Sequence, residues 1–508
     1  MSWTFALAAA LAALPAAAAT PPSSPPAWDA VPLAQGHEKP DLVLTGHVDR
    51  RDYQHNLTVP FAVPEGVERI AVELTYTKGD GRTVINMGLN DGHHIRGWSG
   101  SNKHVAIIDA VSATPAYHPG TIGAGKWSLD LGVSFIGEGV VSDYTARIWF
   151  WRKGERPAVS TYSAAPLRSE ARWYRGDLHL HTGDSDGFCT SRRGQQVPCP
   201  LYRTVDAAEK AQLDFIAITD HNGAAHFNEM RRLQPYYDDV LLIPGRELTT
   251  AQGHANLFGA SGELEYRLGS PPGARDMMEL FREAKQAGAL VSLNHAASQS
   301  SSGCRGCGWS APDAATAMAD AMEAVNGGGL LHSGGMNDAA DTARWEEELA
   351  KGRHTTAIGG SDAHDVDMGR LGVGYPATVV FAPELSERAI LAGIAAGHVW
   401  VDLTGHPGGF VDLQAVSGAW RGMMGDTAPL PKGAVLALNL TTKGFAGASL
   451  AAIVDGKADQ ALSRAALGDG MSALSYVADG QRHWLRFEIR RGEAVLAMTN
   501  PVYIEPAR

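Results

Sequence analysis

The middle of the chain alternates short apolar runs with helical stretches, and this alternation restricts the possible folds more than any other feature. Helical patterns over residues 205 to 212, 277 to 286 and 345 to 351 precede strand-like runs over residues 214 to 219, 289 to 293 and 355 to 358. Strands that alternate with helices are expected to be parallel, with the helices as crossover connections. We therefore expect residues 171 to 403 to form one α/β domain.

In both flanking regions, the spacing of polar and apolar residues differs from that of the middle region. From residue 41 to residue 160, short runs of alternating polar and apolar residues are separated by turn signals such as Asp91-Gly92. This pattern predicts an N-terminal antiparallel β-sandwich. From residue 404 to residue 508 strands and turns return without helices, so we expect a C-terminal β domain of the same kind. A chain of 508 residues is too long for one compact core, which agrees with several domains.

The first 19 residues have the pattern of a secretory signal peptide. An unbroken apolar stretch from residue 5 to residue 14 is followed by Pro15 and by small residues at positions 17 to 19. Residues 20 to 40 are rich in Pro, Ala and Ser and indicate a linker. The apolar stretch from residue 5 to residue 14 is too short for a transmembrane helix, and no later segment is long and apolar enough for one. We expect a periplasmic or secreted protein; a retained anchor or a wrongly placed start are the alternatives.

Charge and cysteine content narrow the function further. The formal net charge of −12 provides no basic surface, which argues against nucleic acid as the main partner. Export permits disulfides, and Cys189, Cys199, Cys304 and Cys307 allow three pairings. The Cys304/Cys307 pair fits a loop staple better than a redox or zinc site, because no second CxxC completes a zinc knuckle. The sequence leaves the oligomeric state open.

The chemistry starts at the beginning of the middle region, with the motif His179-Leu180-His181. Alternate side chains of a strand point to the same face, so the two imidazoles are placed to bind one metal ion. Asp186 follows in Ser185-Asp186-Gly187. An isolated HxH motif fits two surface histidines as well as it fits a metal-binding pair, but further clusters of His, Asp and Glu follow in this sequence.

Five more polar clusters end or directly follow predicted strands, where ligands of parallel α/β folds bind. Their candidate ligands are His221, Glu247, His254, His295, Asp362 and His364. Together with the first cluster this makes three carboxylates and six histidines, which is more than one tetrahedral ion can use. We expect two or three divalent ions, and nitrogen and oxygen ligands without thiolate suit zinc, manganese or iron.

The order of these motifs resembles that of the PHP (polymerase and histidinol phosphatase) family of metal-dependent phosphoesterases, and the arrangement with flanking β domains is similar to its CehA/McbA branch. The resemblance implies a distorted (β/α)7 barrel with the metals at the carboxyl ends of its strands. It also implies three groups of ligands. They are His179, His181, Glu247 and Asp362 for one ion; Glu247, His254 and His295 for a second; and Asp186, His221 and His364 for a third.

We therefore predict a metal-dependent hydrolase that uses a metal-bound hydroxide as nucleophile, most directly a phosphoesterase acting on a small-molecule or polymer-end ester. The same site would serve a carboxylic ester, carbamate or amide hydrolase, as the name of the CehA branch suggests. A third possibility is a non-catalytic protein that binds the envelope or a glycan. An intact ligand set argues against this last one.

Several other residues near these motifs are also candidates for the site. Asp220 is expected to orient a neighbouring imidazole. Arg246 is either a phosphate clamp or part of a structural ion pair. Arg192 and Arg193 in the cysteine loop fit a phosphate contact or, more commonly, solvated loop charges.

Three further positions are also ambiguous. Glu323 and Asn326 end an apolar run and either line the site or satisfy backbone groups. Trp98, next to the Asp91-Gly92 turn, is either a stacking platform for a sugar or, more commonly at such a position, a core tryptophan.

Overall fold

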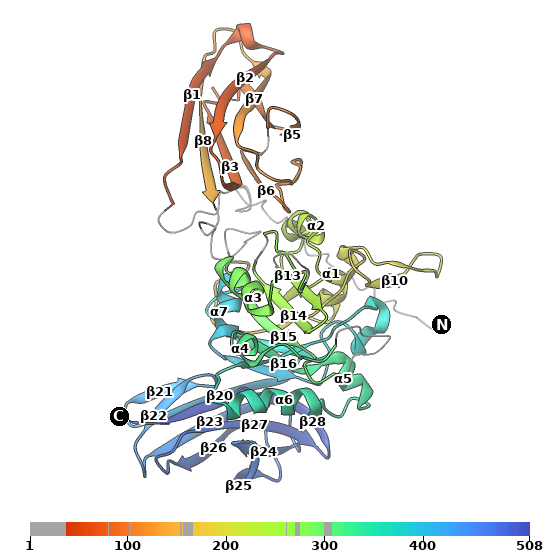
Figure 1. Ribbon diagram of the computed structural model, residues 1–508, viewed down its shortest axis with the longest axis vertical. Helices are drawn as coiled ribbons and strands as arrows, with labels where there is room; N and C mark the ends of the chain where they lie inside the picture. The colour runs from red at the N-terminus through yellow and green to blue at the C-terminus, as the bar shows by residue number, and fades with distance from the viewer. Residues whose placement is uncertain are drawn as a thin grey trace, which may run out of the picture.

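The computed structural model describes residues 37 to 507, except residues 80, 102, 153–154, 156–165, 261, 270–274 and 299–306. The predicted signal peptide, most of the predicted linker and Cys304 lie outside these residues. Figure 1 shows three parts along the long axis of the molecule: N-terminal strands at one end, mixed strands and helices in the middle, and C-terminal strands at the other end.

The N-terminal unit, residues 42 to 152, consists of two antiparallel four-stranded sheets. The first sheet has the order β1 (Leu42–Val48), β8 (Ser142–Arg152), β3 (Val67–Tyr76), β6 (Val105–Asp109). The second has the order β2 (Asn56–Val63), β7 (Gly125–Ile136), β4 (Thr83–Asn90), β5 (Ile95–Ser99). Alternation along the strands drives their packing, because Leu129 and Leu131 of β7 are buried while Ser128 and Asp130 face outward. Apolar residues of both sheets, including Ile70 of β3, form one shared core.

Helix α2 (His226–Leu233) joins this unit to the middle of the chain (Figure 1). The side-chain amide of Asn228 accepts a hydrogen bond from the backbone N–H of Ala113 at 2.9 Å and donates one to the carbonyl of Val111 at 3.0 Å. One asparagine thus satisfies two backbone groups of the neighbouring unit.

The middle strands lie side by side in the order β17, β16, β15, β14, β13, β12, β9, β18. Their bounds are β9 (Arg172–Asp177), β12 (Phe215–Ile218), β13 (Leu241–Thr250), β14 (Gly253–Phe258), β15 (Leu290–Asn294), β16 (Ala321–Asn326), β17 (Thr356–Gly360) and β18 (Ala377–Ala382). The pairs β9–β12, β12–β13, β15–β16 and β16–β17 are parallel. The pairs of β14 with both neighbours and of β18 with β9 are antiparallel, contrary to the expectation of parallel strands. Strand β14 reverses because only two residues separate it from β13, which leaves no room for a crossover.

Helices occur between these strands, and three of the seven in the described residues overlap the stretches that the sequence predicts as helical, whereas the other four were not predicted. They are α1 (Leu201–Lys210), α2, α3 (Met277–Gln286), α4 (Asp313–Thr316), α5 (Gly327–His332), α6 (Ala339–Ala350) and α7 (Glu387–Ala395), with short 3-10 turns at Gln234–Tyr236 and Val366–Leu371. A further 3-10 turn, Arg50–Asp52, lies between β1 and β2 of the N-terminal unit. Helix α3 illustrates why they form. Asp276 and Glu279 make a reciprocal capping box at its start, and Met277, Leu280 and Phe281 bury one face at helical spacing. Among the described residues, no helix has the length and apolar character needed to cross a bilayer.

Side chains rather than a strand ladder cover the free edge of β17. Thr378 in β18 accepts a hydrogen bond from Gly359 N at 2.9 Å and donates one to Gly359 O at 2.6 Å. The amide of Asn500 bonds to both the N–H and the carbonyl of Ala357. These contacts bring the two ends of the strand series together, and the (β/α)7 barrel stays a prediction.

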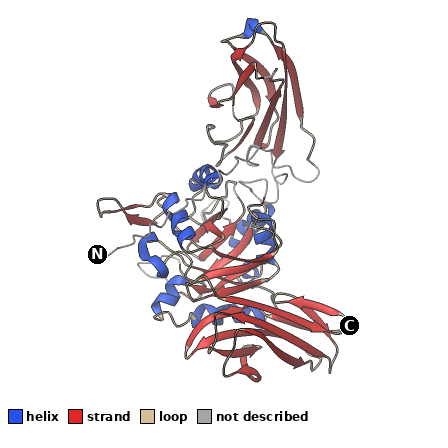
Figure 2. Ribbon diagram, turned by 180° about the vertical axis from the view of Figure 1, so that it is seen from behind, coloured by secondary structure: helices blue, strands red, loops and turns tan. Residues whose placement is uncertain are grey.

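The C-terminal strands continue the same sheet from β18 across residue 404. They are β19 (Val399–Asp402), β28 (Ala494–Thr499), β27 (His483–Arg491), β24 (Ser449–Val454) and β25 (Lys457–Arg464), with β29 (Val502–Pro506) and β22 (Thr427–Leu430) alongside. A further sheet has the order β21 (Trp420–Met423), β20 (Phe410–Ser417), β23 (Val435–Lys443), β26 (Gly470–Val477). Its Leu413 and Leu438 pack with Phe487 of β27 and with Trp400 of β19 in one core. Figure 2 shows this all-strand end next to the helix-containing middle.

Candidate metal centre

All nine predicted ligands lie in one connected group at the edge where the parallel strands end. His179 and His181 follow β9, His221 follows β12, His295 follows β15, and Asp362 and His364 follow β17. Glu247 lies inside β13, which continues past it. His254 is near the start of β14, and because β14 is antiparallel, its beginning lies beside the end of β15, with His254 opposite Asn294. The strand topology thus brings together side chains that are far apart in the sequence.

Glu247 is the centre of this group. One carboxylate oxygen lies 3.3 Å from Nε2 of His179 and 3.2 Å from the nearest ring nitrogens of both His254 and His295. The other oxygen lies 2.8 Å from His221 and 3.7 Å from His181. A buried carboxylate that faces five imidazoles has the position of a ligand shared between ions, as the resemblance implies.

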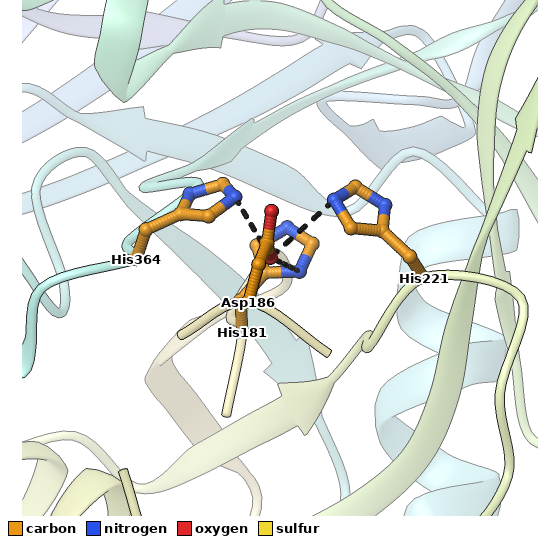
Figure 3. Close-up of side chains that lie close together, drawn as sticks. All are labelled: His181, Asp186, His221 and His364. Atoms are coloured by element: carbon orange, nitrogen blue, oxygen red, sulfur yellow. Dashed lines mark ion pairs between the residues drawn. The ribbon is translucent and has the colours of Figure 1, made fainter. Parts of the chain in front are cut away.

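Asp186 is the centre of a second, more open group (Figure 3). Its Oδ1 atom lies 3.3 Å from His364, 3.5 Å from His221 and 3.9 Å from His181. The side chain of Asp186 is 58% exposed, whereas that of Glu247 is 1% exposed. The site therefore has a closed inner side and an open outer edge.

Glu323 fixes the ring of His179. Its Oε1 atom lies 2.6 Å from Nδ1 of His179, both side chains are buried, and a carboxylate can only accept, so Nδ1 carries a proton. The opposite nitrogen, Nε2, lies 3.3 Å from oxygens of both Glu247 and Asp362 but is buried without a hydrogen-bond partner. Because two carboxylates face this nitrogen, a positive charge is required there, either as a proton on Nε2 or as a cation between the three atoms. This donor set fits a divalent cation, with Glu323 as the outer partner that metal-bound histidines usually have.

The charges of the site support the same conclusion. Among the described residues, every ion pair of Glu247, Asp362 and Asp186 is with a histidine, and none is with Arg or Lys. Buried carboxylates are costly unless they are paired or coordinate a metal. The imidazoles alone must compensate three acids unless cations do so.

The pKa shifts show how strongly these groups depend on each other. Burial lowers the pKa of His221, but its hydrogen bonds with Asp186 and Glu247 outweigh this and raise the pKa to about 10. Burial likewise opposes protonation of His295, and Glu247 raises its pKa to about 9. Hydrogen bonds from His221 and His364 hold the pKa of Asp186 well below its usual range. Without metal, protons on the imidazoles take the place of the cations.

Backbone geometry at the site is unusual in ways that serve these contacts. His295 and Asp362 have φ angles of 30° and 54°, in the left-handed region that non-glycine residues rarely adopt. Gly360 has no side chain for a clear reason, because a Cβ there would lie 2.4 Å from Oε1 of Glu323 and 2.6 Å from Cβ of His179. The close approach of β17 to the His179–Glu323 pair therefore requires glycine.

The structure assigns different surroundings to the two additional predicted residues. Asp220 accepts hydrogen bonds from the N–H and hydroxyl of Thr182 and from Ser185, whose hydroxyl lies 3.4 Å from Nδ1 of His181. It thus holds the loop after the HxH motif and lies 3.2 Å from Nδ1 of the buried His226, but it reaches the predicted ligand His181 only through Ser185. Arg246 is buried and donates to the carbonyl of Gly262 at 2.7 Å. Its neighbour Glu247 points into the site, so Arg246 points to the opposite face of β13, which disfavours a phosphate clamp.

Cysteine pairing and the cysteine loop are also defined in part. Cys189 and Cys199 form a disulfide that joins β10 (Phe188–Thr190) to the residue after β11 (Gln196–Pro198). Arg192 and Arg193 are exposed in the turn between these strands. Cys307 is disulfide-bonded, and its sulfur lies within 4.8 Å of ring nitrogens of His254 and His295. In a disulfide this sulfur is no thiolate and does not compete for metal.

Three residues that contact the ligands were missed in the sequence. Thr249 Oγ1 lies 2.6 Å from Nδ1 of His221, and Asn294 donates to Glu247 at 3.0 Å. Asp177 is buried and accepts from the backbone N–H groups of His179 and Ser361, which fixes the loops after β9 and β17 to each other. Asn294 stands directly before His295, so its position beside a ligand was the available signal. Thr249 and Asp177 have no such signal because their roles depend on strand pairing.

Comparison with known proteins gives little further information. No protein-family model matches the chain, and no curated protein matches it. Among solved structures, a candidate metal-dependent phosphoesterase from Bifidobacterium adolescentis is similar with a TM-score of 0.28 and 17% identity, over 42% of this chain and 95% of that one. A β-glucuronidase from Bacteroides uniformis is similar with a TM-score of 0.20 and 8% identity, over 88% of this chain and 74% of that one. Likenesses of this size define no family, so the function must be argued from the site.

Proposed function

We propose that this chain is an exported metal-dependent hydrolase and that its substrates are phosphoric esters. The observation that carries the proposal is the buried Nε2 atom of His179, which faces oxygens of Glu247 and Asp362 without a hydrogen bond. A divalent cation between these three atoms would take the place of a proton on Nε2 and would be coordinated by all three. Two or three ions of zinc, manganese or iron would fit the full set of nine ligands.

Some residues of the site would hold the metal ions, and others lie where a substrate would enter. Divalent ions held here would supply Lewis acidity to an ester and would acidify water. Glu323 keeps the Nε2 lone pair of His179 directed inward, and Glu247 links the inner histidines. Asp186, His364 and His221 lie at the open edge, with side chains 58%, 34% and 27% exposed, so an ester would approach from their side.

Two lines support phosphoric esters and export. The order of the motifs resembles that of the PHP phosphoesterases, and the first 19 residues resemble a signal peptide. The described site offers three carboxylate ligands and no Arg that points into it, so cations would have to bind and activate a phosphate group. A phosphoesterase activity should therefore depend completely on metal.

The test is an ester panel with controlled metal content. The full mature chain is stripped with a chelator and assayed with an aryl phosphate, a bis-aryl phosphodiester and an aryl carboxylic ester, before and after addition of manganese or zinc. His179→Ala removes an inner ligand, and His94→Ala is the matched control because that side chain is 81% exposed in the N-terminal unit. We expect phosphoester turnover that requires metal, is lost in His179→Ala and is retained in His94→Ala.

Other results would redirect or end the proposal. Metal-dependent turnover of the carboxylic ester alone would assign the site to the carboxylic ester, carbamate or amide alternative. Elemental analysis that finds no bound metal after saturation and gel filtration, together with no turnover, would contradict a metal-dependent hydrolase of any kind.

A further inference from the structure

Trp98 is not a core residue, because its side chain is 40% exposed on the outer surface of the β2-β7-β4-β5 sheet. This sheet belongs to the N-terminal unit, at the end of the molecule opposite the C-terminal strands (Figure 1). A large exposed aromatic ring on a folded sheet needs an explanation, since burial of a tryptophan side chain would be strongly favourable.

The ring lies flat across the sheet because two neighbouring positions are glycines. A Cβ on Gly88 of β4 would lie 2.5 Å from Cε3 of Trp98, and a Cβ on Gly132 of β7 would lie 2.6 Å from Cη2. Any side chain at either position would lift the indole off the sheet. One face of the six-membered ring therefore contacts the backbone of two strands, and the opposite face is exposed to solvent.

Polar side chains surround this ring on the same outer face. In the strand register, Thr58, Asp130, Gly88 and Trp98 lie directly beside one another on neighbouring strands. Asn56, Gly132 and Asn86 lie beside one another in the same way, two residues further along the strands. Among the described residues, the side chains of Asn56, Thr58 and Asn86 make no hydrogen bond within the chain, and neither does the indole N–H. Donors and acceptors around an aromatic plane are thus free for a ligand.

We propose that this surface, the Trp98 face, binds a neutral carbohydrate chain. A pyranose ring has an apolar face of C–H groups, which stacks on an indole, and hydroxyls at its edge, which amides, hydroxyls and a carboxylate can bind. Asp130 is the charged member of the residues around the ring, so its negative charge disfavours phosphorylated or acidic polymers. A protein interface on this surface is the alternative outcome, and the test below separates the two. The Trp98 face would then hold the chain on a polysaccharide while the metal centre acts separately.

Affinity electrophoresis of the full chain tests this inference. Native gels are cast with laminarin, xyloglucan, starch or hydroxyethyl cellulose, and polygalacturonate serves as an acidic comparison. We expect at least one neutral polymer to slow the protein, with no effect of added salt, and Trp98→Ala to weaken the binding about tenfold or more. Asn86→Ala, which leaves the ring in place, should weaken binding by a smaller factor.

Tyr236→Ala is the matched control, because Tyr236 is an exposed aromatic in the middle of the chain, at 79% exposure. It should bind as the unchanged chain does, and Trp98→Ala should retain the metal-dependent turnover of a small aryl ester. The inference is overturned if no neutral polymer slows the protein, or if both Trp98→Ala and Asn86→Ala are slowed like the unchanged chain. It is also overturned if sedimentation shows self-association that Trp98→Ala abolishes, since the Trp98 face would then be a protein interface.

Discussion

The Nδ1 atom of His179 lies 2.6 Å from Oε1 of Glu323, and this contact decides which ring nitrogen of His179 faces the metal centre. The second carboxylate oxygen of Glu323 accepts from the backbone N–H of His295 and from Asn326, both at 3.0 Å. One buried acid therefore positions two predicted ligands that follow different strands.

Glu323→Gln should lower the affinity for metal. An amide can offer its oxygen to His179 or to His295 and Asn326, but it turns an N–H donor toward the donors on the other side. Loss of such an outer partner typically weakens metal binding about 10- to 100-fold. Competition with a chelating dye would measure the change, with Glu347→Gln, an acid that is 64% exposed, as the control. Equal metal affinity in both variants would contradict the positioning role of Glu323.

Asp186→Asn should remove metal from the outer group while the inner group keeps it. Asp186 links His181, His221 and His364 but has no contact with His254 or His295. Elemental analysis should therefore show a smaller metal content per chain, and thermal unfolding of the metal-free variant should be nearly unchanged because the side chain is 58% exposed. A variant that loses all its metal would show that the two groups form one cooperative site.

The metal-free chain should become less stable as the pH rises. Glu247 raises the folded-state pKa of His295 to about 9 against the lowering effect of burial, from an ordinary value of 6.5. The pKa of His221 is raised to about 10 in the same way. The stabilisation from these raised pKa values is complete below about pH 6.5 and is lost as the pH rises through about 9 to 10.

Thermal unfolding with and without zinc would test this pH dependence. The melting temperature of the metal-free chain should fall across this range, and zinc should oppose the fall because ligands bind metal in their deprotonated form. His295→Asn should have a flatter profile. A melting temperature of the metal-free chain that stays constant or rises from neutral to alkaline pH would contradict the proposed imidazolium–carboxylate pairs.

Asn500→Ala should destabilise the contact between β17 and the C-terminal strands. The Asn500 amide accepts from Ala357 N at 2.7 Å and donates to Ala357 O and Val399 O, both at 2.9 Å, and it is buried. Its removal leaves the N–H and carbonyl of Ala357 unsatisfied, whereas Val399 O keeps the bond from the backbone N–H of residue 500, and we expect a loss of about 2 kcal/mol in the free energy of unfolding. Denaturant unfolding would measure it, with Asn439→Ala in β23 as the comparison. A loss below about 0.5 kcal/mol would show that water or a shift of β17 replaces these bonds.

Much of the fold follows from patterns that are local in the sequence. Helix α3 forms where its capping box and apolar spacing predict it, and β12 and β15 lie close to their predicted positions. Strand β14 could not be read as antiparallel from alternation alone, because its direction depends on the two-residue turn after β13. The two interpretations of Trp98, exposed or in the core, could not be separated for a similar reason, since its exposure depends on glycines that lie on two other strands.

The same distinction between local sequence patterns and tertiary contacts applies to the candidate metal centre. The sequence alone determined the nine candidate ligands, because each belongs to a short motif beside an apolar run and is visible without any contact. Only the tertiary structure decided that Glu247 faces five imidazoles, that Glu323 holds His179, and that Arg246 points away from the centre. Such relationships join residues that are far apart along the chain, and strand order and register determine them rather than neighbouring residues.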